Sequence, residues 1–186
     1  MHHQTTNLNC GFVILSPDVS YGHILTTYRS IRTHYPTTPI CCAVAKEVTD
    51  EEMEKIGALC PVYRGNTHFT SLINAGVKNG NKDWNMLVTE GAIVTNGVLD
   101  RYSRFVESEK DILFAILPDY DLQGKPIRLN NTFYDCSLNG IMVHQKMYKK
   151  IGNLTNNPLE ISRVMWALEA IKHGCRFKAI LGIKIV

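Results

Sequence analysis

The chain has 186 residues, of which 45% are hydrophobic and 20% are charged, and its formal net charge is +3. This balance is typical of a globular domain with a sizeable core, and the small net charge argues against nucleic acid as a partner. No hydrophobic run approaches the roughly 20 residues of a membrane span, and residues 1–9 form a polar tail without the hydrophobic core of a signal peptide.

The cysteines favour a cytoplasmic protein with reduced thiols. They occur singly or in one adjacent pair, and no CxxC pair or Cys/His cluster indicates zinc. Several lie in apolar runs, where a free cysteine behaves as a small buried hydrophobe. The six residues are Cys10, Cys41, Cys42, Cys60, Cys136 and Cys175.

Apolar runs and helical periodicities alternate through the first 118 residues. The predicted strands cover residues 12–16, 40–45, 58–63, 84–88 and 112–117. The predicted helices cover residues 22–35, 49–56, 69–79 and 98–107, and Thr49 with Glu52 forms a capping box at the start of the second. This alternation predicts an α/β fold, with a mostly parallel sheet flanked by helices.

The alternation breaks after residue 117. Residues 118–134 are polar and rich in turn residues, and they predict a long functional loop or hairpin. A strand over residues 140–144, a short helix ending at Gly152, a helix over 159–173 and a final strand over 177–186 are expected to follow. Because no linker or repeat interrupts the pattern, we expect residues 1–186 to form a single domain.

Several short motifs accompany this order of elements. They are Ser30-Ile31, Asn74-Ala75-Gly76-Val77, Asn139-Gly140, Ile151-Gly152, and a helix from Leu159-Glu160-Ile161 to Gly174. Together they resemble the nucleotide-sugar-dependent glycosyltransferases of the GT-A fold, nearest to the inverting family 2. The resemblance covers the chain from Phe12 to about Val186 and implies a GT-A, Rossmann-like architecture.

The chain departs from this family at the metal-binding motif. The family places the first aspartate of its Asp-x-Asp motif fifteen residues after the asparagine that corresponds to Asn74, and here that position is Thr89. Gly91 replaces the second aspartate, and Glu90 stands between them. The resemblance therefore supports the fold better than the chemistry.

The resemblance implies a donor site, an acceptor site and a catalytic base. For the nucleotide sugar the expected residues are Ser16, Pro17, Asp18, Lys46, Asn74, Thr89, Glu90, Gly91 and Lys184. For the acceptor they are Asp135, Asn139, His144 and Trp166. Glu160, at a helix start, is the candidate general base.

Several of these residues also have a purely structural interpretation. Glu160 would also complement a helix dipole, and Lys184 would also protect a terminal edge strand. Trp166 would also fill the core, and His144 would also be a satisfied structural histidine. For Asn74 and Asn139, a ligand contact or a loop brace is favoured over simple surface exposure.

Divalent cations prefer several oxygen ligands, commonly carboxylates, and Glu90 alone would supply one. We therefore expect no tightly bound cofactor, with manganese or magnesium as the less favoured alternative. Lys184, Lys46 or Arg64, with the amides of the turn at Glu90 and Gly91, would neutralise the diphosphate instead.

The resemblance implies a glycosyltransferase that moves a sugar from a nucleotide-sugar donor, with a UDP-sugar favoured, to the hydroxyl of a glycan or another acceptor, with inversion expected. The alternative is a catalytically inactive GT-A-like domain that binds a nucleotide sugar or a glycan, which the missing Asp-x-Asp motif favours. A domain for another nucleotide is disfavoured, because the chain has neither a GxGxxG nor a Walker-type motif.

Overall fold

The structure is a computed structural model that describes residues 8–45, 47–66, 68–80, 82–108, 116–117, 140–154, 172 and 178–179. Its elements in chain order are β1 (Cys10–Ser16), α1 (Tyr21–His34), β2 (Ile40–Val44), α2 (Asp50–Gly57), β3 (Val62–Arg64), α3 (Phe69–Asn79), β4 (Trp84–Thr89), α4 (Val98–Ser108), β5 (Ile116–Leu117), β6 (Ile141–His144), α5 (Gln145–Ile151) and β7 (Lys178–Ala179).

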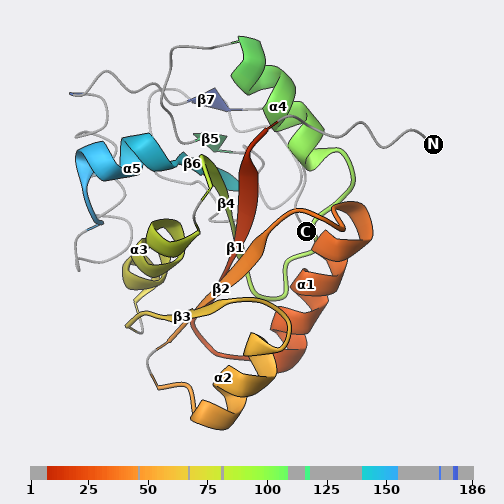
Figure 1. The fold of residues 1–186 in the computed structure, drawn as a ribbon, viewed down its shortest axis with the longest axis vertical. Coiled ribbons are helices and arrows are strands. Elements are labelled where there is room, and N and C mark those ends of the chain that lie inside the picture. Colours follow the sequence, from red (N-terminus) through yellow and green to blue (C-terminus); the bar gives the residue numbers. More distant parts are fainter. Residues whose placement is uncertain are drawn as a thin grey trace.

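The described strands form one sheet of seven strands in the order β3-β2-β1-β4-β6-β5-β7 (Figure 1). β1 lies parallel to both β2 and β4, β3 is parallel to β2, and β7 is parallel to β5. β6 is antiparallel to β4 and to β5. The predicted α/β architecture with a mostly parallel sheet is therefore confirmed.

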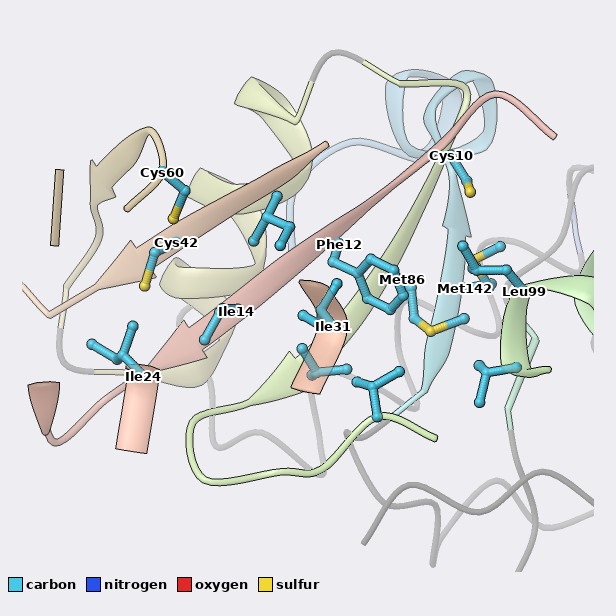
Figure 2. Close-up of a cluster of buried hydrophobic side chains, with 14 of the residues drawn as sticks. Cys10, Phe12, Ile14, Ile24, Ile31, Cys42, Cys60, Met86, Leu99 and Met142 are labelled. Carbon is cyan, nitrogen blue, oxygen red and sulfur yellow. The ribbon is translucent and has the colours of Figure 1, made fainter. Parts of the chain in front are cut away.

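Helices cover both faces of this sheet, α1 and α2 on one side and α3 and α5 on the other (Figure 1). Successive residues of a strand point to opposite faces, so β1 contributes Phe12 and Ile14 to one core cluster and Val13 and Leu15 to the other. The first cluster also contains side chains of α1, α2 and α4, and Figure 2 shows part of it. Burial on both faces explains why these strands read as continuous apolar runs.

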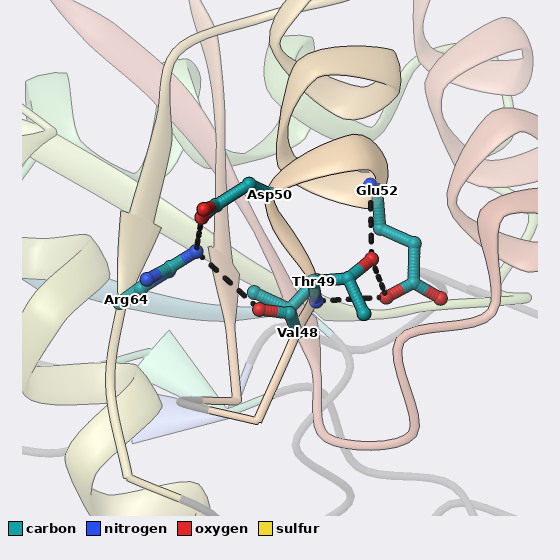
Figure 3. Close-up of polar contacts among 5 residues, drawn as sticks. All are labelled: Val48, Thr49, Asp50, Glu52 and Arg64. Atoms are coloured by element: carbon teal, nitrogen blue, oxygen red, sulfur yellow. Dashed lines mark hydrogen bonds and ion pairs between the residues drawn. The ribbon is translucent and has the colours of Figure 1, made fainter.

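The capping box at α2 forms as predicted (Figure 3). The Thr49 side chain accepts the backbone N–H of Glu52, and the Glu52 carboxylate accepts the backbone N–H of Thr49. Arg64, at the end of β3, reaches the same helix start and donates to the Asp50 carboxylate at 2.6 Å and to the carbonyl oxygen of Val48 at 3.3 Å. These contacts fix the connection between β2 and β3.

The predicted third strand, residues 58–63, is partly wrong. Residues 58–60 continue the turn that ends α2, because the backbone N–H groups of Leu59 and Cys60 both donate to the carbonyl oxygen of Ile56. The strand itself runs from Val62 to Arg64. Cys60 is nevertheless buried, so the apolar run reflects buried residues of a turn as well as of a strand.

Several predicted elements fall largely outside the described residues. These are the loop over 118–134, residues 112–115 of the fifth strand, and all but one residue of the helix over 159–173. In the ranges that are described, no helix is both long enough and apolar enough to cross a membrane.

Candidate functional site at the carboxyl ends of β1 and β4

The order of the strands reverses between β1 and β4. From β1 the chain proceeds outward through β2 and β3, and it then returns to form β4 on the other side of β1. In open α/β sheets, ligands bind at such a switch point, outside the carboxyl ends of the strands. Leu15 pairs with Thr89 there, so the loop after β1 and the turn after β4 leave the sheet side by side.

The structure therefore brings together two segments that the sequence predicted for the donor site, residues 16–18 and 89–91. The Glu90 carboxylate joins them directly. Its Oε1 accepts the backbone N–H of Asp18 at 3.0 Å, and its Oε2 accepts the backbone N–H of Ser20 at 2.9 Å. Glu90 thus holds the loop that leads into α1.

Ser16 ends β1 at the same edge. Its side chain is fully buried, and its Oγ has no hydrogen-bond partner among the described residues. Buried hydroxyl groups are almost always paired with protein or ordered water. Ser16 is therefore a buried polar group at the switch point whose partner is not among the described residues.

Two exposed large hydrophobic side chains of the described region flank this edge, and sequence reasoning missed both. Tyr21 is the first residue of α1, and Ile93 follows the Gly91 turn. His23 is also exposed there, and its carbonyl oxygen accepts the backbone N–H of Gly91 at 3.2 Å. Their positions beside the two predicted loops were the signal that could have identified them.

The family-like motif at Asn74 and Gly76 braces the fold. Asn74 Nδ2 donates to the carbonyl oxygen of Leu154 at 2.9 Å, while its Oδ1 accepts the Leu154 backbone N–H at 2.9 Å and the Tyr148 hydroxyl. At Gly76 an added Cβ would lie 2.2 Å from Val13 Cγ1, so the glycine lets α3 approach β1. The structure therefore shows Asn74 bracing a loop, and its contact with a ligand stays a prediction.

Other motif residues also have packing or capping roles. Ser30 Oγ accepts the backbone N–H of Val94 at 3.0 Å, which ties the segment after the Gly91 turn to α1. Gly140 adopts a φ of +83° and donates its N–H to the carbonyl oxygen of Leu87 at 2.7 Å. Gly152 adopts a φ of +90° and ends α5.

His144 lies at the opposite edge of the sheet, because β6 is antiparallel to β4. It pairs with Trp84, the first residue of β4, whereas the candidate site begins at Thr89. Five residues of strand correspond to about 17 Å at roughly 3.3 Å per residue. The structure thus separates His144 from the donor edge, contrary to the expectation that it would reach the site.

His144 instead caps α5. Its Nδ1 accepts the backbone N–H of Lys146 at 3.0 Å, and its ring packs edge-on against Trp84 with centroids 4.6 Å apart. Burial is the largest influence on its pKa, which lies below the ordinary value of histidine. The neutral ring is therefore the stable form.

Among the expected cations, Arg64 is already paired with Asp50. Six other predicted site residues lie outside the described ranges, so the structure does not place them. They are Lys46, Asp135, Asn139, Glu160, Trp166 and Lys184.

The two segments at this edge carry two carboxylates, those of Asp18 and Glu90, and each oxygen of Glu90 already accepts a backbone N–H. Within the described ranges, no group of three or more His, Cys, Asp or Glu side chains could hold a metal ion.

No protein-family model matches the chain, and neither does any curated protein sequence. Solved structures, however, share its fold. S. aureus TarS matches with a TM-score of 0.66 and 10% identity over 94% of this chain and 36% of TarS. A cytidylyltransferase from Leptospira borgpetersenii matches with a TM-score of 0.65 and 12% identity, over 94% of this chain and 76% of that enzyme.

The bifunctional IspDF of Campylobacter jejuni matches with a TM-score of 0.59 and 11% identity, over 94% of this chain and 50% of that protein. Identities this low show similarity of fold alone. The chain also spans less than two thirds of the length of the two leading TarS structures, 36% of one and 55% of the other.

Proposed function

We propose that the protein is a nucleotide-sugar-dependent glycosyltransferase whose donor site lies at the carboxyl ends of β1 and β4. The observation that carries this proposal is the switch point itself, where the loop after β1 and the turn after β4 are bound together. The shared fold with TarS, a glycosyltransferase that has been solved in complex with UDP, supports a UDP-sugar as the donor.

In the proposed site, the loop over residues 16–18 and the turn over 89–91 receive the nucleotide and its phosphates. Tyr21 offers an exposed aromatic face at the same edge, suited to stacking on a base or a sugar.

The proposed reaction is a single inverting displacement without a metal. Glu160 removes the proton from the acceptor hydroxyl as its oxygen attacks the anomeric carbon and the bond to the diphosphate breaks. Lys46 and Lys184 stabilise the departing diphosphate, because the backbone N–H groups of Glu90 and Gly91 already donate to the carbonyl oxygens of Leu15 and His23. Asp135, Asn139 and Trp166 are proposed for the acceptor side, and the acceptor is a glycan or another hydroxyl compound.

The proposed location is the cytoplasm. Four free cysteines, Cys10, Cys41, Cys42 and Cys60, are buried in the two core clusters of the sheet. Burial is the largest influence on the pKa of each of these thiols, and it raises the pKa of Cys10 and of Cys60 to about 11. Reduced thiols of this kind are typical of proteins from a reducing compartment, which supports the proposal.

Two other functions have specific support. Thr89 and Gly91 stand where family 2 has its aspartates, which favours a domain that binds a nucleotide sugar without transferring it. The Leptospira cytidylyltransferase is covered to 76% of its length, which favours a site for CTP. Both alternatives use the same edge of the sheet and differ in the ligand or in turnover.

The test is isothermal titration calorimetry with UDP, UDP-sugars, GDP-sugars and CTP, each with manganese and with a chelator, followed by an assay of donor hydrolysis. Binding of a UDP-sugar with turnover supports the transferase, and the same binding without turnover supports the inactive domain. Selective binding of CTP would replace the proposal with a nucleotidyl-transfer function. Failure of every nucleotide to bind would overturn it.

A further inference from the structure

The turn after β4 is attached to the loop after β1 at four points. The backbone N–H of Glu90 donates to the carbonyl oxygen of Leu15 at 2.9 Å, and Gly91 donates to His23 at 3.2 Å. Between these bonds, the Glu90 carboxylate accepts the backbone N–H groups of Asp18 and Ser20. The loop is thus fixed at both ends and in its middle.

The middle of the loop is strained. Val19 adopts a φ of +53°, in the left-handed region that β-branched residues strongly disfavour. Its side chain packs against the core cluster shared by α1 and the sheet. The two amides bound by Glu90 belong to the residues on either side of Val19, so the carboxylate holds this conformation directly.

We infer that Glu90 is a positioning residue for the donor loop, and that its carboxylate keeps Val19 left-handed so that residues 16–18 face the nucleotide. This inference rests on the proposed function, because it assumes that the donor binds at this edge. The two charge-assisted hydrogen bonds come from Ser20, the N-cap of α1, and from Asp18, two residues before it, which makes the restraint strong. The negative charge near the start of this helix of 14 residues also complements its dipole.

This role differs from that of a metal-motif carboxylate. A metal ligand would direct its oxygens toward the phosphates, whereas both oxygens of Glu90 accept amides of the chain itself. Glu90 therefore acts on the donor through the loop. Its removal should weaken donor binding with or without manganese.

The test compares Glu90→Gln with Glu52→Gln. Glu52 is a matched control, because its carboxylate also accepts a backbone N–H at a helix start, but at α2, where it binds Thr49 and not the loop after β1. UDP affinity is measured by calorimetry, and amide hydrogen exchange at residues 18 and 20 is measured in the same variants. We expect Glu90→Gln to bind UDP roughly tenfold more weakly, about 1.4 kcal/mol, and to exchange both amides faster, while Glu52→Gln matches the wild type in both.

Val19→Gly supplies a second measurement, whose result would not change if Glu90 only stabilised the fold. Glycine adopts positive φ without steric cost, so the loop then depends less on the carboxylate. The tenfold loss caused by Glu90→Gln should fall to less than about threefold in the Val19→Gly background, as a double-mutant cycle measures it. If Glu90→Gln does not fold, Glu90→Asp, which keeps the charge but shortens the reach, takes its place.

The two proposals fail in different ways. If the wild type binds UDP and the Glu90 variants bind it equally well, the inference is overturned and the donor site stands. If the wild type binds none of the nucleotides, the proposed function is overturned and the inference falls with it. Amide exchange then still reports whether Glu90 holds the loop.

Discussion

The His144 side chain makes the stability of the protein sensitive to mild acid. Its folded-state pKa is lowered, mainly by burial, while Asp83 acts in the opposite direction and Lys146 lowers it further. Below the unfolded-state pKa of about 6.5, the unfolded chain binds the proton more readily than the folded chain does. Protonation of Nδ1 would also remove the acceptor that caps α5.

We therefore expect the free energy of unfolding to fall as the pH decreases through about 6.5, by less than about 1 kcal/mol on account of this residue. His144→Asn keeps a capping acceptor that does not titrate in this range. Urea unfolding of both proteins at about pH 7.5 and about pH 5 measures the difference. Equal pH dependence in the two proteins would contradict the prediction.

The role of Glu160 as general base is also testable with a single residue change. Glu160→Gln removes the proton acceptor at nearly constant size, so turnover should fall by at least about a hundredfold while UDP binding remains. Glu54→Gln, on an exposed position of α2, is the control for the loss of one charge. Activity that is unchanged in Glu160→Gln would remove Glu160 from the mechanism.

At the scale of elements, the approach of α3 to the sheet depends on Gly76. A Cβ there would lie 2.2 Å from Val13 Cγ1 and 3.5 Å from Ala43 Cβ, both in the buried centre of the sheet. Gly76→Ala should therefore lower the free energy of unfolding by about 1–3 kcal/mol through overpacking. Denaturant unfolding at equilibrium measures the loss.

Gly57→Ala is the matched control. Gly57 is the last residue of α2, and no atom lies within 4 Å of the position that its Cβ would take. Alanine is the better helix former by up to about 1 kcal/mol, so this variant should be neutral or more stable. A loss at Gly57 equal to that at Gly76 would mean that the close approach to Val13 is not the cause.

The elements also explain how much of the fold could be predicted from the sequence. Strands buried on both faces produce apolar runs, and a capping box marks a helix start, so β1, β2, α2, α3 and β4 were predicted closely. Whether a strand runs parallel or antiparallel to its neighbours has no such signature in the sequence. His144 was expected near the site because it ends a strand, but β6 is antiparallel, and its carboxyl end lies at the amino end of β4.

The family resemblance led to residues 16–18 and 89–91, and the structure brings these two segments together. The contacts between them could not be predicted. Nothing in the pattern indicated that the Glu90 carboxylate binds the amides of Asp18 and Ser20, since those residues are 72 and 70 positions away along the chain. Such a contact depends on which strands are neighbours and on loop conformation, and a local pattern records neither.

For the whole molecule, the proposal predicts stabilisation by the nucleotide in the absence of metal. UDP at about a hundred times its dissociation constant should raise the free energy of unfolding by about 2.7 kcal/mol by mass action, equally with manganese and with a chelator. The reason is that, within the described ranges, no group of three or more His, Cys, Asp or Glu side chains could hold a metal ion. Thermal unfolding with and without UDP measures the shift, and stabilisation that requires manganese would refute metal independence.

The central position of β1 has a consequence for how the chain folds during synthesis. β1 is synthesised before the other described strands, yet one of its two neighbours is β4, and the loop after it is held by Glu90. Until residue 90 has been translated, β1 exposes an unpaired apolar edge and α1 begins without its carboxylate partner. Contacts of such high sequence separation form late and slowly, so this interval is when the nascent chain is most exposed to aggregation.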